Sequence, residues 1–199
     1  MRLSIIIISA VLLVDQISKF WIKLSMHYGE SISVFGDWFY IHFIENPGMA
    51  FGLAFGGTIG KVLLTLFRFA AIIAIGYYLF KKAIKLPSKG FIIAISLIFA
   101  GALGNLIDSL FYGVIFSASS PYNVAEFLPE AGGYGKFLQG KVVDMLYFPI
   151  VEGHWPNWVP FVGGDYMVFF RPIFNIADTA ISVGVGMLIL FQKKYLTTN

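Results

Sequence analysis

Four long apolar segments constrain the fold of this chain more than any other feature. They lie at about 3–25, 59–80, 90–112 and 172–192, and each is long enough as a helix to cross the roughly 30 Å hydrocarbon core of a bilayer. Hydrophobic residues make up 58% of the chain and charged residues only 13%, against about 25% charged residues in soluble domains. We therefore predict a polytopic α-helical membrane protein, with four transmembrane helices in a single integral-membrane domain over residues 1–199.

The lysines predict how these helices are oriented. Residues 81–89, KKAIKLPSK, carry four lysines between the second and third segments, and basic residues also flank the first segment before it and the fourth segment after it. By the positive-inside rule this loop and both termini face the cytoplasm. The loops 26–58 and 113–171 then face outside. The first is rich in aromatic and β-branched residues, which predicts a small extracytoplasmic β-rich subdomain, and the second is an extended outer loop.

Polar residues collect at one predicted depth, near the outer ends of the helices, although charged groups are costly in lipid. Asp15 and Lys19 are four residues apart, a spacing that suits an ion pair. Asp108 is placed to brace the end of its helix, and asparagines can hydrogen-bond between membrane helices. Each of these structural roles competes with a functional one. The full set is Asp15, Lys19, Asn46, Asn105, Asp108, Asp144, Asn175 and Asp178.

A purely structural role explains Asp144 and Asp178 least well. Neither has an obvious cationic neighbour in the sequence, and apolar surroundings should raise the pKa of each. The chain has no cysteine, which excludes thiolate catalysis and cysteine-bound metals. Its three histidines lack the spacing of a metal hydrolase, and it contains no GxSxG motif. A serine–lysine dyad is compatible with the composition, but no serine has an obvious lysine neighbour at the membrane surface.

Paired carboxylates are the catalytic groups that remain, because two close carboxyls share a proton and can act as base and acid on water and a carbonyl. A different class is a proton-coupled transporter, in which buried aspartates relay protons. A non-catalytic lipid-binding scaffold is a third class, although it would not need two aspartates. The net charge of +3 is too small and too scattered to indicate a nucleic-acid partner.

Five motifs in order resemble the bacterial lipoprotein signal peptidases, or type II signal peptidases. They are DQISK at 15–19, NPGMAFG at 46–52, GALGNLID at 101–108, VVDM at 142–145 and FNIADTAIS at 174–182. The resemblance implies an intramembrane aspartyl endopeptidase of the bacterial inner membrane that needs no metal or cofactor. Its substrates would be prolipoproteins, cut just before a cysteine that carries diacylglyceryl while the lipid chains stay in the membrane. The cyclic peptide globomycin would inhibit it.

The same resemblance assigns roles to individual residues. Asp144 and Asp178 would form the catalytic dyad. The supporting residues would be Asn46, Asn105 and Asn175, which position the substrate backbone or the site, together with Asp15, Lys19, Gly104 and Asp108. Two features depart from the family pattern. Ser109 stands where the family usually has arginine, and residues 114–139 are an insertion, which we expect to form a mobile cover over the site.

Overall fold

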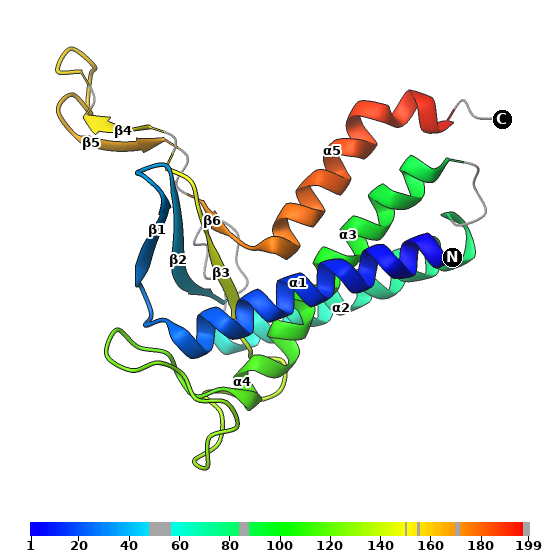
Figure 1. The fold of residues 1–199 in the computed structure, drawn as a ribbon, viewed down its shortest axis with the longest axis horizontal. Coiled ribbons are helices and arrows are strands. Elements are labelled where there is room, and N and C mark those ends of the chain that lie inside the picture. Colours follow the sequence, from blue (N-terminus) through cyan, green and yellow to red (C-terminus); the bar gives the residue numbers. More distant parts are fainter. Residues whose placement is uncertain (48–56, 84–87, 150, 155, 170–171, 197–199) are drawn as a thin grey trace.

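The computed structural model combines a group of long helices with a small antiparallel sheet at one end of them (Figure 1). It describes residues 1–47, 57–83, 88–149, 151–154, 156–169 and 172–196. The helices are α1 (Arg2–Ser25), α2 (Gly57–Lys81), α3 (Lys89–Ile107), α4 (Gly113–Ile115) and α5 (Ile176–Leu196), and a π-helical turn, Asp108–Tyr112, joins α3 to α4. The beginning of α1, the end of α2, the beginning of α3 and the end of α5 all lie away from the sheet (Figure 1).

The helices match the predicted spans, with differences at their ends. Within the part of the chain that the structure describes, three helical stretches are long and apolar enough to cross a membrane: α1, α2 and the continuous run from Lys89 to Ile115. In α5 the apolar stretch found among the described residues, Ile176–Phe191, is shorter. The prediction that the fourth span begins at 172 was wrong, because Ile173 and Phe174 form a strand and α5 starts only at Ile176.

Many apolar side chains on the outer faces of α1 and α2 have no protein neighbours to cover them. Examples are Ile6 and Ile17 on α1, which are 64% and 67% exposed, and Phe67 on α2, which is 71% exposed. Soluble monomers rarely expose apolar patches of this extent. A lipid environment accounts for these faces, since hydrocarbon is as apolar as the side chains themselves.

α3 is the central helix and packs against α1, α2 and α5. The close packing of α3 against α5 depends in part on the absence of a side chain at Gly184, because a Cβ atom there would lie 2.7 Å from the carbonyl oxygen of Ala94. Small residues at helix interfaces let membrane helices pack at short range. The same packing brings the first turn of α5 against the second half of α3, where the predicted polar residues lie.

The sheet confirms the predicted β-rich subdomain. Its strand order is β1 (Ser31–Phe35), β2 (Phe39–Asn46), β3 (Val142–Tyr147) and β6 (Ile173–Phe174), all antiparallel neighbours. A separate hairpin pairs β4 (Val151–His154) with β5 (Tyr166–Phe169) and projects beyond the sheet (Figure 1). Because β6 leads directly into α5, the pairing of β6 with β3 holds the start of α5 beside β3. Residues 48–52 of the NPGMAFG motif lie outside the described residues.

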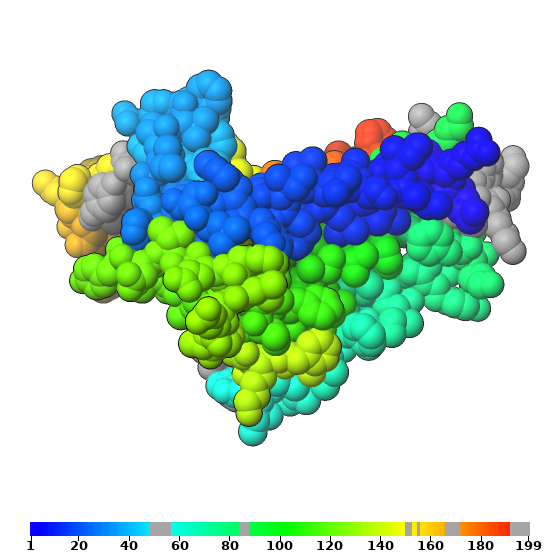
Figure 2. Space-filling model, turned by 60° about the horizontal axis from the view of Figure 1, so that its bottom comes forward, coloured from blue at the N-terminus to red at the C-terminus, as the bar shows by residue number. Residues whose placement is uncertain are grey.

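The inserted segment 114–139 packs along the second half of α1 (Figure 2). Phe116 is fully buried, with its ring 5.0 Å from that of Phe20 and 4.9 Å from that of Tyr112. Lys23 of α1 donates a hydrogen bond to Ser119 at 2.8 Å. Within the described residues, no hydrogen bond joins this segment to either aspartate of the predicted dyad. The segment is anchored by these contacts, and its role as a cover over the site stays a prediction.

Candidate active site

Asp178 is held in the first turn of α5 by a reciprocal pair of hydrogen bonds. The backbone N–H of Asp178 donates to Oδ1 of Asn175 at 2.9 Å, and the backbone N–H of Asn175 donates to Oδ2 of Asp178 at 3.3 Å. This is a capping box, with Asn175 as the N-cap and the carboxylate three residues later. The positive end of the helix dipole also favours a carboxylate at this position. The local sequence NIAD therefore supplies two of the hydrogen bonds that orient Asp178.

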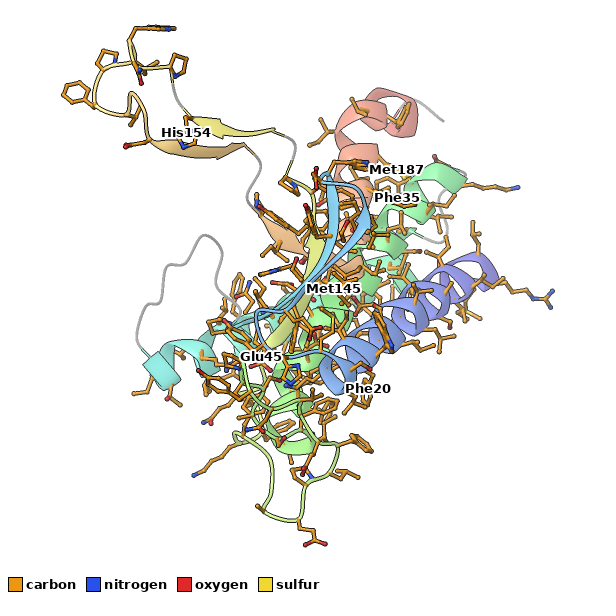
Figure 3. The ribbon with its side chains drawn as sticks, turned by 60° about the vertical axis from the view of Figure 1, so that its left-hand side comes forward. Phe20, Phe35, Glu45, Met145, His154 and Met187 are labelled. Carbon is orange, nitrogen blue, oxygen red and sulfur yellow. The ribbon has the colours of Figure 1, made fainter. Side chains whose placement is uncertain are left out.

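Asp144 lies on β3, where side chains alternate between the two faces of the sheet. Val143 and Met145 belong to the hydrophobic cluster that also contains Ile22 and Phe43, and Figure 3 shows Met145 where the sheet meets the helices. Asp144 points to the opposite face and is only 2% exposed. Its environment is therefore set by the strand register, which aims one carboxylate into a buried position between sheet and helices.

Three asparagine amides donate to the two carboxylates of the predicted dyad. Asn175 donates to Oδ1 of Asp144 at 2.7 Å, and Asn46 donates to Oδ2 of Asp144 at 3.2 Å. Asn105 donates to Oδ1 of Asp178 at 2.8 Å. Asn175 consequently contacts both carboxylates, because it also caps the helix turn that holds Asp178. The structure thus brings together all five of these predicted residues, from β2, α3, β3 and the start of α5.

Burial and charge favour the protonated form of Asp144. Removal from water, and then the nearby charge of Asp178, raise the pKa of Asp144 from its ordinary value of 3.8 to about 7, although the amides of Asn46 and Asn175 oppose this change. Asp178 is the less buried of the two. Two neighbouring carboxyls of unequal burial can hold one proton between them, which is the arrangement that general acid–base chemistry on water requires.

Lys19 forms the centre of a buried ion network beside this pair. Its ammonium group lies 2.8 Å from Asp15 and 2.8 Å from Asp108, and all three side chains are inaccessible to solvent. The predicted ion pair between Asp15 and Lys19 is confirmed, and it includes Asp108 as well. Lys19 also donates to Oδ1 of Asn105 at 2.9 Å. Because Asn105 in turn donates to Asp178, the network reaches the candidate dyad through a single amide.

The two network carboxylates also bind the backbone segments that carry the dyad. Asp15 accepts a hydrogen bond from the backbone N–H of Ala177 in α5 at 2.9 Å, and Asp108 accepts one from the backbone N–H of Val143 in β3 at 3.3 Å. Gly104 leaves room for this arrangement, because a Cβ atom there would lie 2.7 Å from Oδ2 of Asp15. Asp15 and Asp108 thus contact the two segments that carry the dyad, and a mainly structural role for them stays a prediction.

Gln16 is a site residue that sequence analysis missed. Its side-chain amide nitrogen lies within hydrogen-bonding distance of Asp108 at 3.0 Å and of the carbonyl oxygen of Gly104 at 3.3 Å. Its side-chain oxygen accepts a bond from the hydroxyl of Tyr112 at 3.1 Å. Its place inside the DQISK motif was the available signal, although the spacing alone does not show that Gln16 points inward with Asp15.

Arg68 is a second residue whose role the sequence did not reveal. It lies on α2 between Thr65 and Ile72, which are both buried and lie on the same helical face. The charges of Asp178 and Asp144 act on its guanidinium group. The candidate dyad therefore has a cation nearby, supplied by a helix whose sequence gives no hint of that proximity. Ser109, at the position where arginine was expected, instead donates from its hydroxyl to the carbonyl oxygen of Asn105 at 2.9 Å.

Comparisons with known proteins agree with one another. The family model described as signal peptidase (SPase) II matches residues 7–193. A lipoprotein signal peptidase of Porphyromonas gingivalis is 47% identical over 188 residues, which cover 92% of this chain and 80% of that protein. One from Amoebophilus asiaticus is 40% identical over 183 residues, covering 90% and 73%. A solved structure described as a bacterial membrane enzyme is similar with a TM-score of 0.65 at 28% identity, covering 100% of this chain and 92% of that one.

Proposed function

Because this chain belongs to the signal peptidase II family, we propose that Asp144 and Asp178 are the catalytic pair with which it cleaves its substrates. The protein is a membrane peptidase that removes signal peptides from prolipoproteins. The interpretation from the sequence is confirmed to that extent, and the comparisons give no support to the transporter alternative.

One observation carries the assignment of the pair: Asn175 binds Asp144 through its side-chain nitrogen while its oxygen caps the turn that holds Asp178. We assign the shared proton to Asp144, the more buried carboxyl, whose pKa is raised. Asp178 takes a proton from a water molecule, and the water oxygen adds to the scissile carbonyl while Asp144 gives its proton to the carbonyl oxygen. Collapse of this tetrahedral intermediate breaks the C–N bond, as Asp178 gives its proton to the leaving nitrogen and Asp144 takes one back from the intermediate. No covalent intermediate and no metal are needed in this scheme.

The asparagines hold the two carboxyls in these roles. Asn46 and Asn175 donate to Asp144, and Asn105 donates to Asp178. Amides at fixed positions stabilise charge without reorganising during the reaction. Asn46 and Asn105 are only partly buried, so we also assign them contacts with the substrate backbone.

The substrate we propose is a prolipoprotein with a diacylglyceryl cysteine that enters sideways from the bilayer. The exposed apolar faces of the helices support this route, because a signal helix and acyl chains can reach the protein without leaving lipid. Each buried CH₂ contributes about 0.8 kcal/mol. A globomycin-type cyclic peptide would compete for the same place.

We place the protein in the bacterial inner membrane with both termini in the cytoplasm and the dyad near the outer face. The lysine-rich loop supports this orientation. The arrangement of the helices also supports it. The start of α1, the end of α5 and the helix ends next to the lysine-rich loop lie on the side away from the sheet (Figure 1).

The chain has no cysteine, so single introduced cysteines can report on which side of the membrane a residue lies. A membrane-impermeant maleimide should label Glu130→Cys in intact spheroplasts, and Arg2→Cys only after permeabilisation. The reverse pattern would invert the orientation.

The catalytic assignment is tested with purified protein in lipid vesicles and a lipidated precursor peptide. Asp144→Asn and Asp178→Asn should each abolish cleavage, while Asp37→Asn, an exposed aspartate on the turn between β1 and β2, should cleave as the wild type does. Chelators should have no effect, globomycin should inhibit, and an unlipidated precursor should be cut poorly. Near-normal turnover in either dyad variant would refute the pair, and equal cutting of both precursors would refute lipid recognition.

A further inference from the structure

A pocket lies between the beginning of α2 and the end of the inserted segment, and neither aspartate of the candidate dyad lines it. Its volume is about 310 Å³, within the range of small-molecule sites. The residues lining it are Pro47, Gly57, Thr58, Lys61, Tyr134, Gly135, Gln139 and Lys141. Half of these belong to the insertion or its immediate flank, so the pocket depends on the part of the chain that departs from the usual family pattern.

The described residues of the lining are rich in hydrogen-bond donors, and none of them carries a carboxylate. Among the described residues, the ammonium group of Lys61 has no hydrogen-bond or ion-pair partner. The hydroxyl of Tyr134 accepts a bond from the backbone N–H of Lys141 at 2.7 Å, which leaves its proton to donate. The side-chain oxygen of Gln139 is also occupied, by the backbone N–H of Lys136 at 3.2 Å, so its amide nitrogen is the group left to donate.

The charged side chains around the pocket also have an excess of positive charge. Glu45, which Figure 3 labels on β2, accepts a salt bridge from Lys141 at 2.9 Å and another from the buried ammonium of Lys23. Lys61 is within range of the charges of both Lys141 and Glu45. Three ammonium groups therefore share a single carboxylate. Lys61, which has no partner within the described ranges, is the pocket lysine that an additional anion would satisfy.

We propose that this pocket binds a phosphate group, with Lys61 and Lys141 as its cationic contacts. Phosphate accepts several charge-assisted hydrogen bonds at once, and the first backbone N–H groups of α2, at the edge of the pocket, add to the attraction. Lys61 lies in the first turns of a membrane-spanning helix, which is the depth of phospholipid headgroups. The phosphate can come from such a headgroup or from free phosphate, and the experiment separates the two.

The test measures binding to dye-labelled full-length protein in a phosphate-free, non-ionic detergent by microscale thermophoresis. The three probes are dihexanoyl phosphatidylglycerol, inorganic phosphate, and dihexanoylglycerol, which has the same acyl chains without phosphate. Lys61→Gln should weaken binding of the phospholipid about 10-fold, since a hydrogen bond to a charged group contributes about 1.5–3 kcal/mol. The matched control is Lys136→Gln, an exposed lysine of the insertion outside the pocket, which should bind as the wild type does.

The pattern across the probes decides the outcome. Tighter binding of the phospholipid than of inorganic phosphate, with both weakened by Lys61→Gln, identifies a headgroup site. Equal binding of the two identifies a site for free phosphate. The proposal is overturned if Lys61→Gln and Lys136→Gln bind both phosphate probes equally, or if Lys61→Gln weakens dihexanoylglycerol binding as much as phospholipid binding. Cleavage of a lipidated precursor by Lys61→Gln in detergent shows that the variant is folded.

Discussion

Replacing Asp144 by Asn should make the protein more stable at neutral pH while abolishing cleavage. The reason is the high pKa of Asp144, about 7 in the folded protein against an ordinary value of 3.8. Between these two values the unfolded chain has lost the proton while the folded protein retains it. The free energy of unfolding of the wild type therefore falls as the pH rises through this window, and asparagine, which does not titrate, removes that loss.

The size of the effect follows from the two pKa values. Their difference of about 3, at about 1.36 kcal/mol for each pKa unit, gives about 4 kcal/mol. The contribution of the protonated Asp144 carboxyl to the free energy of unfolding is fully present below about pH 4 and is lost above about pH 7. The stability difference between Asp144→Asn and the wild type should therefore be about 4 kcal/mol larger at pH 8 than at pH 4. Any change in hydrogen bonding that the asparagine introduces is common to both pH values and cancels.

The assay is unfolding in mixed micelles at pH 4, 5, 6, 7 and 8, followed by tryptophan fluorescence for the wild type, Asp144→Asn and Asp37→Asn. The exposed control should parallel the wild type at every pH. A second variant, Asp178→Asn, removes the neighbouring charge, so it should show a smaller pH dependence than the wild type. A stability difference for Asp144→Asn that stays constant from pH 4 to pH 8 would refute the claim that burial holds this carboxyl protonated.

Four further predictions follow from the site. Lys19→Met should lower the free energy of unfolding by about 3–5 kcal/mol, since it leaves buried carboxylates without their cation; recovery of stability in Lys19→Met/Asp15→Asn would confirm the cause. Asn175→Ala should lose the helix cap, at about 1 kcal/mol, and reduce cleavage more than 10-fold, whereas Asn175→Ser should keep the helix cap and still lose the cleavage, because its shorter side chain cannot reach the Asp144 carboxylate. Gly104→Ala should lower the unfolding midpoint by the equivalent of about 1–3 kcal/mol, because its methyl group would meet the Asp15 carboxylate. The rate of cleavage should fall on both sides of a pH optimum, as expected for an acid–base pair, and a flat profile would contradict it.

The membrane helices and the convergence of polar residues were predictable from the sequence. The length of each apolar segment predicts a membrane span almost directly. Polar residues are costly in lipid, so those that occur within or next to a span indicate a structural or functional site. The ion pair between Asp15 and Lys19 follows from a spacing of four. The capping box of Asn175 and Asp178 could also have been identified from NIAD, because a cap followed three residues later by an acidic side chain is a local signature.

Other parts of the site depend on contacts between distant segments and have no such signature. Nothing near Arg68 in the sequence shows that α2 carries it toward the aspartates, because this depends on how α2 packs against α3. The cluster of Lys23, Glu45 and Lys141 joins α1, β2 and the residues between the insertion and β3, which are far apart along the chain. The start of α5 was misplaced because hydropathy does not distinguish a short apolar strand from the first turn of an apolar helix.

The order of the charges along the chain has a consequence for biogenesis. Asp15 and Lys19 lie one turn apart and form an ion pair, so the acid of α1 enters the bilayer together with a cation that can pair with it. Arg68 follows with α2, and the remaining site acids, Asp108, Asp144 and Asp178, are synthesised only afterwards. Each later carboxylate therefore reaches a membrane region where a cation is already present. A chain released after α2 would hold that cation without its acids.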